Sequence, residues 1–320
     1  MHSGELFVYG LNLIYNTTLT RLNRQAGFFY LKFLTMETLK IAVQKSGRLK
    51  DDSLKLLKDI GISIDNGKEQ LKARATNFPI EVFYLRNGDI PQYLADGVVD
   101  VAIIGNNVLA EKGNSIQWEL ALGFSRCRVS VAVPKTTSYS SIKDLNGKKI
   151  ATSYPNTVQA FLDEQGVQAD IHIINGSVEI APNIGLADAI VDIVSTGGTL
   201  FKNNLIEKEV ILESEAVLAV SPKIQSKQIQ ILDRIKFRMA SVLKGRNSKY
   251  VLLNAPNEKL EQIISILPGM KSPTVLPLAK SGWSSVHSVI DQHQFWDIID
   301  DLKVNGAEGI LICPIEKMVL

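Results

Sequence analysis

The feature that most constrains the fold of this chain is a short pattern that occurs twice. Leu94–Val101 reads LADGVVDV, and 92 residues later Leu186–Ile193 reads LADAIVDI, with Gly105 and Gly197 at the same offset. Helix–glycine–strand junctions reuse the same residue types, so chance is one explanation. We prefer two similar α/β lobes, each ending a strand at a loop that faces a shared cleft, because open α/β sheets bind ligands at the carboxyl ends of their strands.

Strand and helix patterns alternate from Leu39 onward. A short apolar strand is followed by a helix that Asp51 and Asp52 can cap and that Gly61 ends. Alternating elements of this length predict a parallel sheet with helices on its faces, the α/β class. The next predicted elements are a strand at 81–85, a helix from Asp89 to Gly97 and a strand at 98–104.

Two strands that end in proline are predicted to carry the chain between the lobes. Arg128–Pro134 leaves the first lobe and Ala216–Pro222 returns to it, and proline suits the end of a strand. We therefore expect residues 36–132 and 216–226 to form the first lobe, and residues 133–215 to form the second.

The pattern changes after Gln228. A helix over 229–244 is followed by elements in the order β-α-β-β-α-β, which is the ferredoxin-like order. Residues 227–320 are therefore predicted to form a third domain. Small domains of this kind often sense metabolites, although the topology alone does not prove it. The predicted elements are strands at 250–254, 273–278, 283–290 and 308–313 and helices at 258–267 and 295–304.

The composition narrows the classes of function. The chain has 320 residues, enough for two or three domains, and a formal net charge of only +2. This charge provides no global basic field for nucleic acid and no polybasic face for a membrane, so any anion must be held by a local cluster. The two cysteines and four histidines form no ligand-spaced motif, and we expect buried thiols in a reducing compartment.

Residues 1–35 stand apart from the regular pattern that begins at Met36. Arg21, Arg24 and Lys32 interrupt their apolar pieces, so the segment has neither a membrane-spanning run nor the order of charged, apolar and small residues of a secretion signal. We interpret it as an upstream extension without function. The expected protein is cytoplasmic, with no membrane and no nucleic-acid partner.

The strongest local signal for chemistry is Asp192–Thr199, which reads DIVSTGGT. Its two glycines let successive backbone N–H groups turn toward one point, its hydroxyls add donors, and a following helix would add partial positive charge. These groups suit a phosphate monoester, while Asp192 could accept from sugar hydroxyls. No lysine follows the second glycine, so this is not a Walker loop. An ordinary glycine-containing turn is the alternative.

A second candidate loop, Gln44–Arg48, follows the first strand at the ligand-facing edge. Lys45 and Arg48 place two cations where a polyphosphate could lie, and arginine can hold phosphate through two N–H groups. A solvated loop is the alternative. Arg86 occupies the equivalent edge after the next strand. Asp100 interrupts an apolar strand, so it is either a structural hydrogen-bond anchor or a cleft residue.

These residues belong to segments that closely resemble the ATP phosphoribosyltransferase family. The segments are 41–49 (IAVQKSGRL), 97–105 (GVVDVAIIG), 150–155 (IATSYP) and 185–200 (GLADAIVDIVSTGGTL). The resemblance covers about residues 38–320, and the last segment is highly specific. Segments 272–278 (SPTVLPL) and 314–318 (PIEKM) resemble the long form of the family, which carries its own regulatory domain.

The resemblance implies two catalytic lobes like those of periplasmic binding proteins and a C-terminal regulatory domain. It implies the first committed step of L-histidine biosynthesis, in which ATP and 5-phosphoribosyl 1-pyrophosphate (PRPP) give N1-(5-phosphoribosyl)-ATP and pyrophosphate. The reaction depends on Mg²⁺, which we expect to be held mainly by pyrophosphate oxygens. The resemblance also implies feedback inhibition by L-histidine at the third domain and a homo-oligomer in which dimers and hexamers exchange.

Residue roles follow from the matched segments and the loops described above. The expected catalytic residues are Lys45, Arg48 and Arg86. The expected PRPP-binding residues are Glu179, Asp192, Ser195, Thr196, Gly197, Gly198 and Thr199. The expected ATP-binding residues are Gln44, Lys45, Ser46, Gly47, Arg48, Asp100 and Tyr154. The expected histidine contacts are Asn254 and Thr274.

Two other classes of protein compete with this interpretation. A solute-binding or sensor protein shares the two-lobe fold, but it would need a secretion signal and would not need the Ser-Thr-Gly-Gly-Thr loop. A transcriptional effector domain would need a helix-turn-helix segment, and none precedes the lobes.

Overall fold

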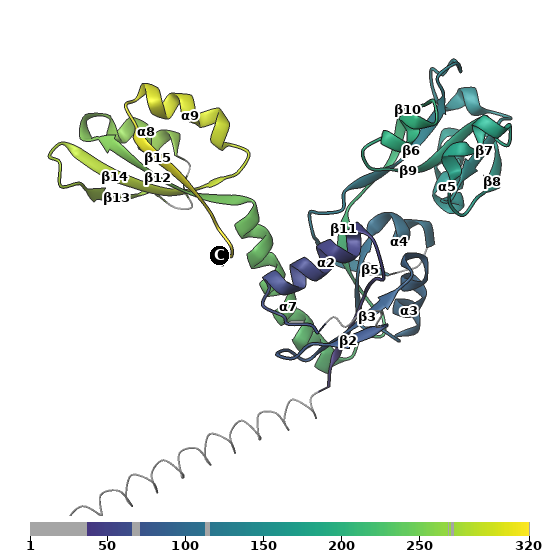
Figure 1. The fold of residues 1–320 in the computed structure, drawn as a ribbon, viewed down its shortest axis with the longest axis horizontal. Coiled ribbons are helices and arrows are strands. Elements are labelled where there is room, and N and C mark those ends of the chain that lie inside the picture. Colours follow the sequence, from purple (N-terminus) through teal and green to yellow (C-terminus); the bar gives the residue numbers. More distant parts are fainter. Residues whose placement is uncertain (1–36, 66–70, 113–115, 268, 270–271, 320) are drawn as a thin grey trace, which may run out of the picture.

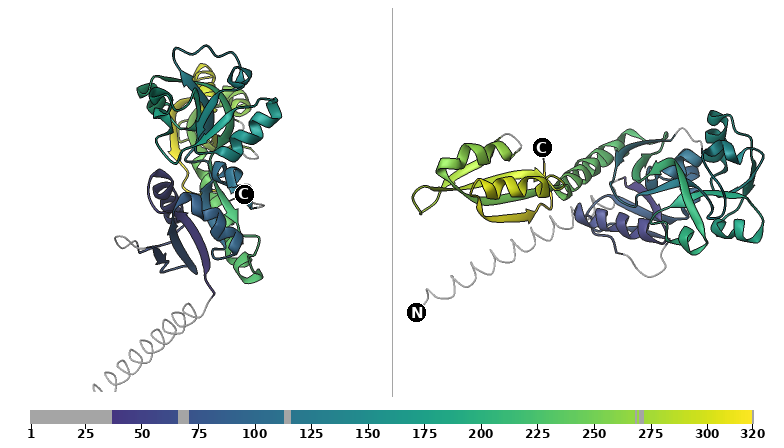
Figure 2. Two further views of the ribbon diagram at one scale, coloured as in Figure 1. Left: turned by 90° about the vertical axis from the view of Figure 1, so that its right-hand side faces the viewer. Right: turned by 90° about the horizontal axis from the view of Figure 1, so that it is seen from above.

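The chain folds into two α/β lobes and a C-terminal domain. The computed structural model describes residues 37–65, 71–112, 116–267, 269 and 272–319. The long helix α7 (Ser226–Arg246) joins the first lobe to the C-terminal domain (Figure 1), and the two further views show the same link (Figure 2). The predicted fold class is confirmed. The proposed extension, residues 1–35, lies outside the described residues.

The first lobe is built on a six-stranded sheet in the order β2-β3-β1-β4-β11-β5. Its centre, β3-β1-β4, is parallel as the alternating pattern predicted, and β11 runs antiparallel beside β4. The strands are β1 (Leu39–Gln44), β2 (Lys72–Arg74), β3 (Ile80–Leu85), β4 (Val101–Gly105), β5 (Gln117–Ala121) and β11 (Ala216–Val220).

The second lobe repeats this plan on a five-stranded sheet in the order β10-β6-β9-β7-β8. Its parallel strands, β9-β7-β8, extend to one edge of the sheet, and β6 runs antiparallel beside β9. The strands are β6 (Cys127–Pro134), β7 (Lys149–Thr152), β8 (Asp170–Ile173), β9 (Ala189–Val194) and β10 (Leu205–Ser214).

The strand β6 corrects one predicted boundary. All of its partners, on β9 and β10, belong to the second sheet. The chain therefore crosses between the lobes before Cys127, and the first lobe does not extend to residue 132. The return crossing lies between Ser214 and Ala216.

Helices cover both faces of the first sheet. On one face α2 (Arg48–Asp59) and α7 share a core with β1, into which Leu57 and Met239 pack. On the other face α3 (Ile90–Asp96) and α4 (Asn106–Lys112) form a separate core. Because α7 completes the first lobe, the predicted start of the third domain at residue 227 is too early.

The second sheet is also covered on both faces. The 3-10 turn η2 (Ile142–Leu145) and the helix α5 (Pro155–Gln165) pack on one face. The turn η3 (Val178–Ile180) and the short helix α6 (Gly198–Lys202) pack on the other.

The third domain has the ferredoxin-like topology that the order of its elements predicted. Its antiparallel sheet runs β13-β14-β12-β15, with α8 and α9 packed on one face. The elements are β12 (Ser248–Pro256), α8 (Leu260–Ile266), β13 (Thr274–Pro277), β14 (Trp283–Asp291), α9 (Phe295–Val304) and β15 (Glu308–Pro314).

The strands of the internal repeat align at a different offset from the one that the sequence pattern indicated. The Asp100 N–H donates to the Lys40 carbonyl at 3.0 Å, and the Lys40 N–H donates to the Asp100 carboxylate at 2.7 Å. Asp188 exchanges the same two bonds with Lys149, each 2.9 Å long. The counterpart of Asp100 is therefore Asp188 and not Asp192.

The helices that follow these strands keep the original offset. In the first lobe α4 begins at Asn106, directly after Gly105. In the second lobe α6 begins at Gly198, and residues 194–197 are four residues with no counterpart in the first lobe. Three residues of the predicted phosphate loop, Ser195–Gly197, thus belong to an addition to a framework that both lobes share.

Candidate active site in the cleft between the lobes

The carboxyl ends of the parallel strands of both lobes open onto one cleft. A cavity of ≈ 200 Å³ is lined by Gln44 and Arg48 from the first lobe and by Ser195 from the second. A neighbouring cavity of ≈ 540 Å³ is lined by Arg126, Arg128 and again Ser195. Residues that were predicted for ATP and for PRPP therefore meet in one place.

The predicted phosphate loop, Ser195–Thr199, connects β9 to α6. Gly197 has a φ of 76° and is the N-cap of α6, a left-handed conformation that glycine adopts without a side-chain clash. The three hydroxyl side chains of the loop are exposed. Because α6 is only five residues long, hydroxyls and backbone amides must supply most of the attraction for a phosphate, and the helix dipole little.

Asp192 lies on β9, and its charge interacts with that of Glu179, the other carboxylate predicted to bind PRPP. Ser153 Oγ donates to Asp192 Oδ1 at 2.7 Å. Burial raises the pKa of the Asp192 carboxyl, the charge of Glu179 raises it further, and the bond from Ser153 lowers it. A partly buried carboxylate is a hydrogen-bond acceptor only, which suits the hydroxyls of a ribose.

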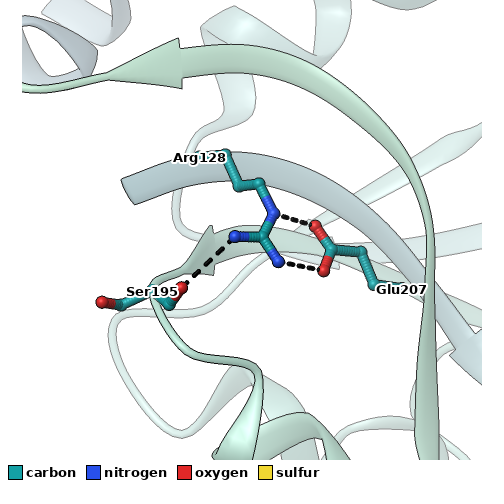
Figure 3. Close-up of polar contacts among 3 residues, drawn as sticks. All are labelled: Arg128, Ser195 and Glu207. Atoms are coloured by element: carbon teal, nitrogen blue, oxygen red, sulfur yellow. Dashed lines mark hydrogen bonds and ion pairs between the residues drawn. The ribbon is translucent and has the colours of Figure 1, made fainter. Parts of the chain in front are cut away.

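Arg128, at the start of β6, was not among the predicted site residues. Its guanidinium donates to both carboxylate oxygens of Glu207 on β10, and its Nη1 donates to the Ser195 carbonyl at 3.2 Å (Figure 3). These bonds lower the pKa of Glu207. The pair ties the first residue of the phosphate loop to the sheet. The sequence feature that could have indicated Arg128 is its position as a charged residue at the start of a largely apolar strand.

The loop Gln44–Arg48 connects β1 to α2, with Gly47 (φ 87°) as the N-cap. Arg48 is exposed and its Nε lies 3.6 Å from Asp52 Oδ2, an ion pair that solvent weakens. Arg86 is also exposed and follows β3, so it lies at the same edge of the sheet. Arg48 lines the cavity, while Lys45 and Arg86 are placed only at the same edge of the first sheet, where the Lys45 N–H donates to the Leu85 carbonyl at 2.8 Å.

Asp100 lies at the opposite end of β4 from the cleft. Its carboxylate accepts the Lys40 N–H at the amino edge of the sheet, and burial raises the pKa of this carboxyl. This position corrects the assignment of Asp100 to the ATP site and favours the other alternative, a structural anchor.

Tyr154 belongs to the second lobe, directly before α5. Its Oη accepts a hydrogen bond of 2.8 Å from Asn107 Nδ2 of the first lobe, and burial raises the pKa of the phenol. Tyr154 therefore lies where the lobes touch, and its role in ATP binding stays a prediction.

The two predicted histidine contacts lie on the sheet of the third domain, on the face away from α8 and α9. Asn254 on β12 is paired with Ser285, and Thr274 on β13 is paired with His287. Ser285 and His287 lie two residues apart on the same face of β14, with Ser285 Oγ 3.1 Å from His287 Nε2. The predicted contacts thus flank one polar strip of β14.

The described part of the chain holds no group of three or more His, Cys, Asp and Glu residues that could bind a metal ion. Asp192, three residues before the phosphate loop, and Glu179 are two carboxylates whose charges interact. Carboxylate oxygens are suitable ligands for Mg²⁺, so these residues fit an ion that arrives with a polyphosphate substrate.

Among the described helices, none combines the length and the apolar character that spanning a membrane requires.

The fold and the cleft define a bilobal α/β enzyme with a C-terminal ferredoxin-like domain. The family model for ATP phosphoribosyltransferase matches residues 86–241, and the model for the HisG C-terminal domain matches residues 245–317. ATP phosphoribosyltransferases of Parabacteroides distasonis and Cytophaga hutchinsonii are 52% and 50% identical, over 88% of this chain and 100% and 98% of theirs. The chain belongs to the ATP phosphoribosyltransferase family and is thus a pentosyltransferase of histidine biosynthesis.

A solved relative agrees with a large part of the fold. The ATP phosphoribosyl transferase (HisG:HisZ) complex from Thermotoga maritima contains a chain that is 31% identical, with a TM-score of 0.55. The match covers 63% of this chain and 99% of that chain. The C-terminal family model begins at residue 245, which agrees with a third domain that starts after α7.

Proposed function

We propose that this protein condenses ATP with PRPP to N1-(5-phosphoribosyl)-ATP and pyrophosphate. The observation that carries the proposal is the cavity in which Gln44 and Arg48 of one lobe meet Ser195 of the other. A cationic loop suits the phosphates of ATP and the departing pyrophosphate, and a loop of hydroxyls and glycines suits the 5-phosphate of the sugar. Membership of the family supports the same reaction.

In this reaction N1 of adenine attacks the anomeric carbon of PRPP as the bond to pyrophosphate breaks. Negative charge grows on pyrophosphate and positive charge on the ribose ring. Since little proton transfer is needed, positioning and electrostatic stabilisation dominate. We assign the ribose hydroxyls to Asp192, and the phosphates of ATP or of the leaving pyrophosphate to Lys45, Arg48 and Arg86.

We include Mg²⁺ in the proposal as an ion held mainly by pyrophosphate oxygens. Bound there, it would neutralise charge on the leaving group. Asp192 and Glu179 are the side chains that would complete its coordination from the protein.

The test is the ultraviolet absorbance change on mixing the purified protein with ATP, PRPP and Mg²⁺. Product should form only when both substrates and the metal ion are present. Binding of either substrate without any product would favour a solute-binding role instead.

We further propose that L-histidine inhibits the enzyme by binding at the third domain, near Asn254 and Thr274. The test is a chain that ends after Arg246. This end point retains α7, whose Ile235 and Met239 belong to the core of the first lobe, whereas a cut at Gln228 would remove them. The truncated enzyme should turn over and ignore histidine, and persistent inhibition would place the effector elsewhere.

We also propose a cytoplasmic homo-oligomer that exchanges between dimer and hexamer. Light scattering at several protein concentrations, with and without histidine, should show two masses in a three-to-one ratio. A single mass under all conditions would contradict this part of the proposal.

A further inference from the structure

The two lobes touch through α4 and α5. The first residues of α4, Asn106 and Asn107, are bonded to Glu215 and Ser214 at the return crossing, and Glu111 lies one turn further along the helix. Glu111 lies on α4 of the first lobe and is only 7% exposed. α5 begins at Pro155 in the second lobe, and Figure 1 shows the two helices on facing sides of the lobes. A buried carboxylate must be hydrogen-bonded, so its partners reveal what it holds.

Glu111 is hydrogen-bonded to Asn156 and Thr157, which lie in the first turn of α5. Its Oε1 accepts the Asn156 N–H at 3.0 Å. Its Oε2 accepts the Thr157 N–H at 2.9 Å and the Thr157 hydroxyl at 2.8 Å. Asn156 Nδ2 also donates to the Glu111 carbonyl at 2.9 Å. The carboxylate of one lobe thus caps a helix of the other.

The helix α5 has no cap of its own at this end. Its N-cap residue is Tyr154, which makes no capping side-chain hydrogen bond. The first N–H groups of a helix need an acceptor, and a negative charge there is favourable. Glu111 supplies both from the first lobe, so the orientation of α5 depends on where α4 stands.

The first turn of α5 leads directly into the PRPP half of the cleft. Tyr154 accepts from Asn107, which lies one turn before Glu111 on α4. Ser153, the next residue back along the chain, donates to Asp192 at 2.7 Å. A short run of bonded residues therefore connects α4 of the first lobe to the carboxylate assigned to the ribose.

We propose that Glu111 is a positioning residue that sets the angle between the lobes, and with it the distance between the ATP loop and the ribose site. The inference rests on the proposed function, in which one reactant is held by each lobe. Glu111 itself touches neither substrate. Its effect is on the alignment of adenine N1 with the anomeric carbon, to which rates are sensitive.

The test compares Glu111→Gln with Glu164→Gln. Both changes remove one carboxylate, but Glu164 is exposed near the far end of α5. We expect Glu111→Gln to lower kcat at least about tenfold with both KM values within about twofold, because binding to each lobe is retained. Hydrogen exchange at the Asn156 and Thr157 amides should become faster. Glu164→Gln should match the wild type in all of these measurements.

Assays are run well below the melting temperature of each variant, so that a merely destabilised protein keeps its kcat. A wild-type kcat in Glu111→Gln overturns the proposal. If kcat is unchanged but PRPP binds more weakly, the proposal also fails, because the effect of Glu111 is then confined to the second lobe. If the wild type itself forms no product, the proposed function fails first.

Thr157→Val keeps the proposal testable if Glu111→Gln does not fold. It removes one of the hydrogen bonds and leaves the carboxylate and the backbone bonds in place. We expect kcat to fall by about two- to fivefold without a change in KM, because one hydrogen bond is lost while the two backbone N–H bonds to the carboxylate remain. An unchanged kcat in this folded variant would overturn the role of the contact.

Discussion

The two lobes share one framework and differ where chemistry is expected. In both, an aspartate at the amino end of a central strand, Asp100 or Asp188, exchanges two hydrogen bonds with the neighbouring strand. At the carboxyl end of that strand the lobes diverge. The first enters α4 at once, and α4 carries Glu111 to the other lobe, whereas the second adds residues 194–197 before α6. The arrangement that both lobes share forms the two sheets. The segments in which the lobes differ lie at the cleft.

The largest expected effect comes from removing this difference. Deletion of residues 195–197 would join Val194, the last residue of β9, directly to α6, as β4 joins α4, so the fold should survive. PRPP binding should be lost and turnover should fall by at least about 10³-fold, because Ser195, Thr196 and Gly197 disappear, and with them most of the groups predicted to hold the 5-phosphate. Calorimetric titration with PRPP and circular dichroism measure the two outcomes. A folded deletion variant that still binds PRPP would contradict the assignment of the loop.

Arg48→Ala tests the opposite lobe. Its guanidinium is exposed beside Asp52, so the fold should be unchanged, while turnover should fall by about 10²-fold through loss of charge stabilisation at the pyrophosphate. Lys58→Ala, at the far end of the same helix, is the matched control. Equal kinetics in Arg48→Ala and the wild type would remove Arg48 from the active site.

Asp192 and Asp100 should respond in opposite ways. Burial raises the pKa of Asp192, so its ionised form is held at a cost, and Asp192→Asn should preserve or raise stability at neutral pH while PRPP affinity falls about tenfold or more. Burial raises the pKa of Asp100 as well, but its carboxylate accepts a backbone N–H, that of Lys40. Asp100→Ala removes this acceptor and should lower the free energy of unfolding by about 1–2 kcal/mol, with both KM values unchanged. Urea unfolding and steady-state kinetics measure both. The reverse pattern, in which Asp100 affects the KM values and Asp192 the stability, would contradict both assigned roles.

The sequence predicted most of the fold because local signals are strong where helices and strands are regular. α9 occupies Phe295–Val304, as its apolar spacing indicated, and the order of elements in the third domain determined its topology. The repeat was misaligned for a physical reason. The strands align when Asp100 is matched with Asp188, and the following helices align when Asn106 is matched with Gly198. The second offset is larger than the first, and a comparison without gaps can use only one offset.

The contacts between distant residues could not be predicted in the same way. Arg128 and Glu207 are 79 residues apart, and Glu111 is 46 residues from Thr157. No periodicity connects such pairs, because sheet pairing and lobe packing bring them together. Asp100 shows the opposite problem. A carboxylate in an apolar strand looks the same in the sequence whether it binds a ligand or anchors a neighbouring backbone amide.

The smallest expected effect is on stability, and it comes from the ion pairs beside the two loops, Arg128–Glu207 in the second lobe and Arg48–Asp52 in the first. Arg128 lowers the pKa of Glu207 below its ordinary 4.5, so the pair stabilises the protein above that pH and this contribution disappears as pH falls through the folded-state pKa. Glu207→Gln should therefore lower the free energy of unfolding by about 1 kcal/mol at neutral pH and by less in acid. Asp52→Asn, which removes the exposed and longer pair at Arg48, should have a smaller effect at neutral pH. Equal losses in the two variants at neutral pH, measured by urea unfolding, would mean that the second lobe holds its loop no more firmly than the first.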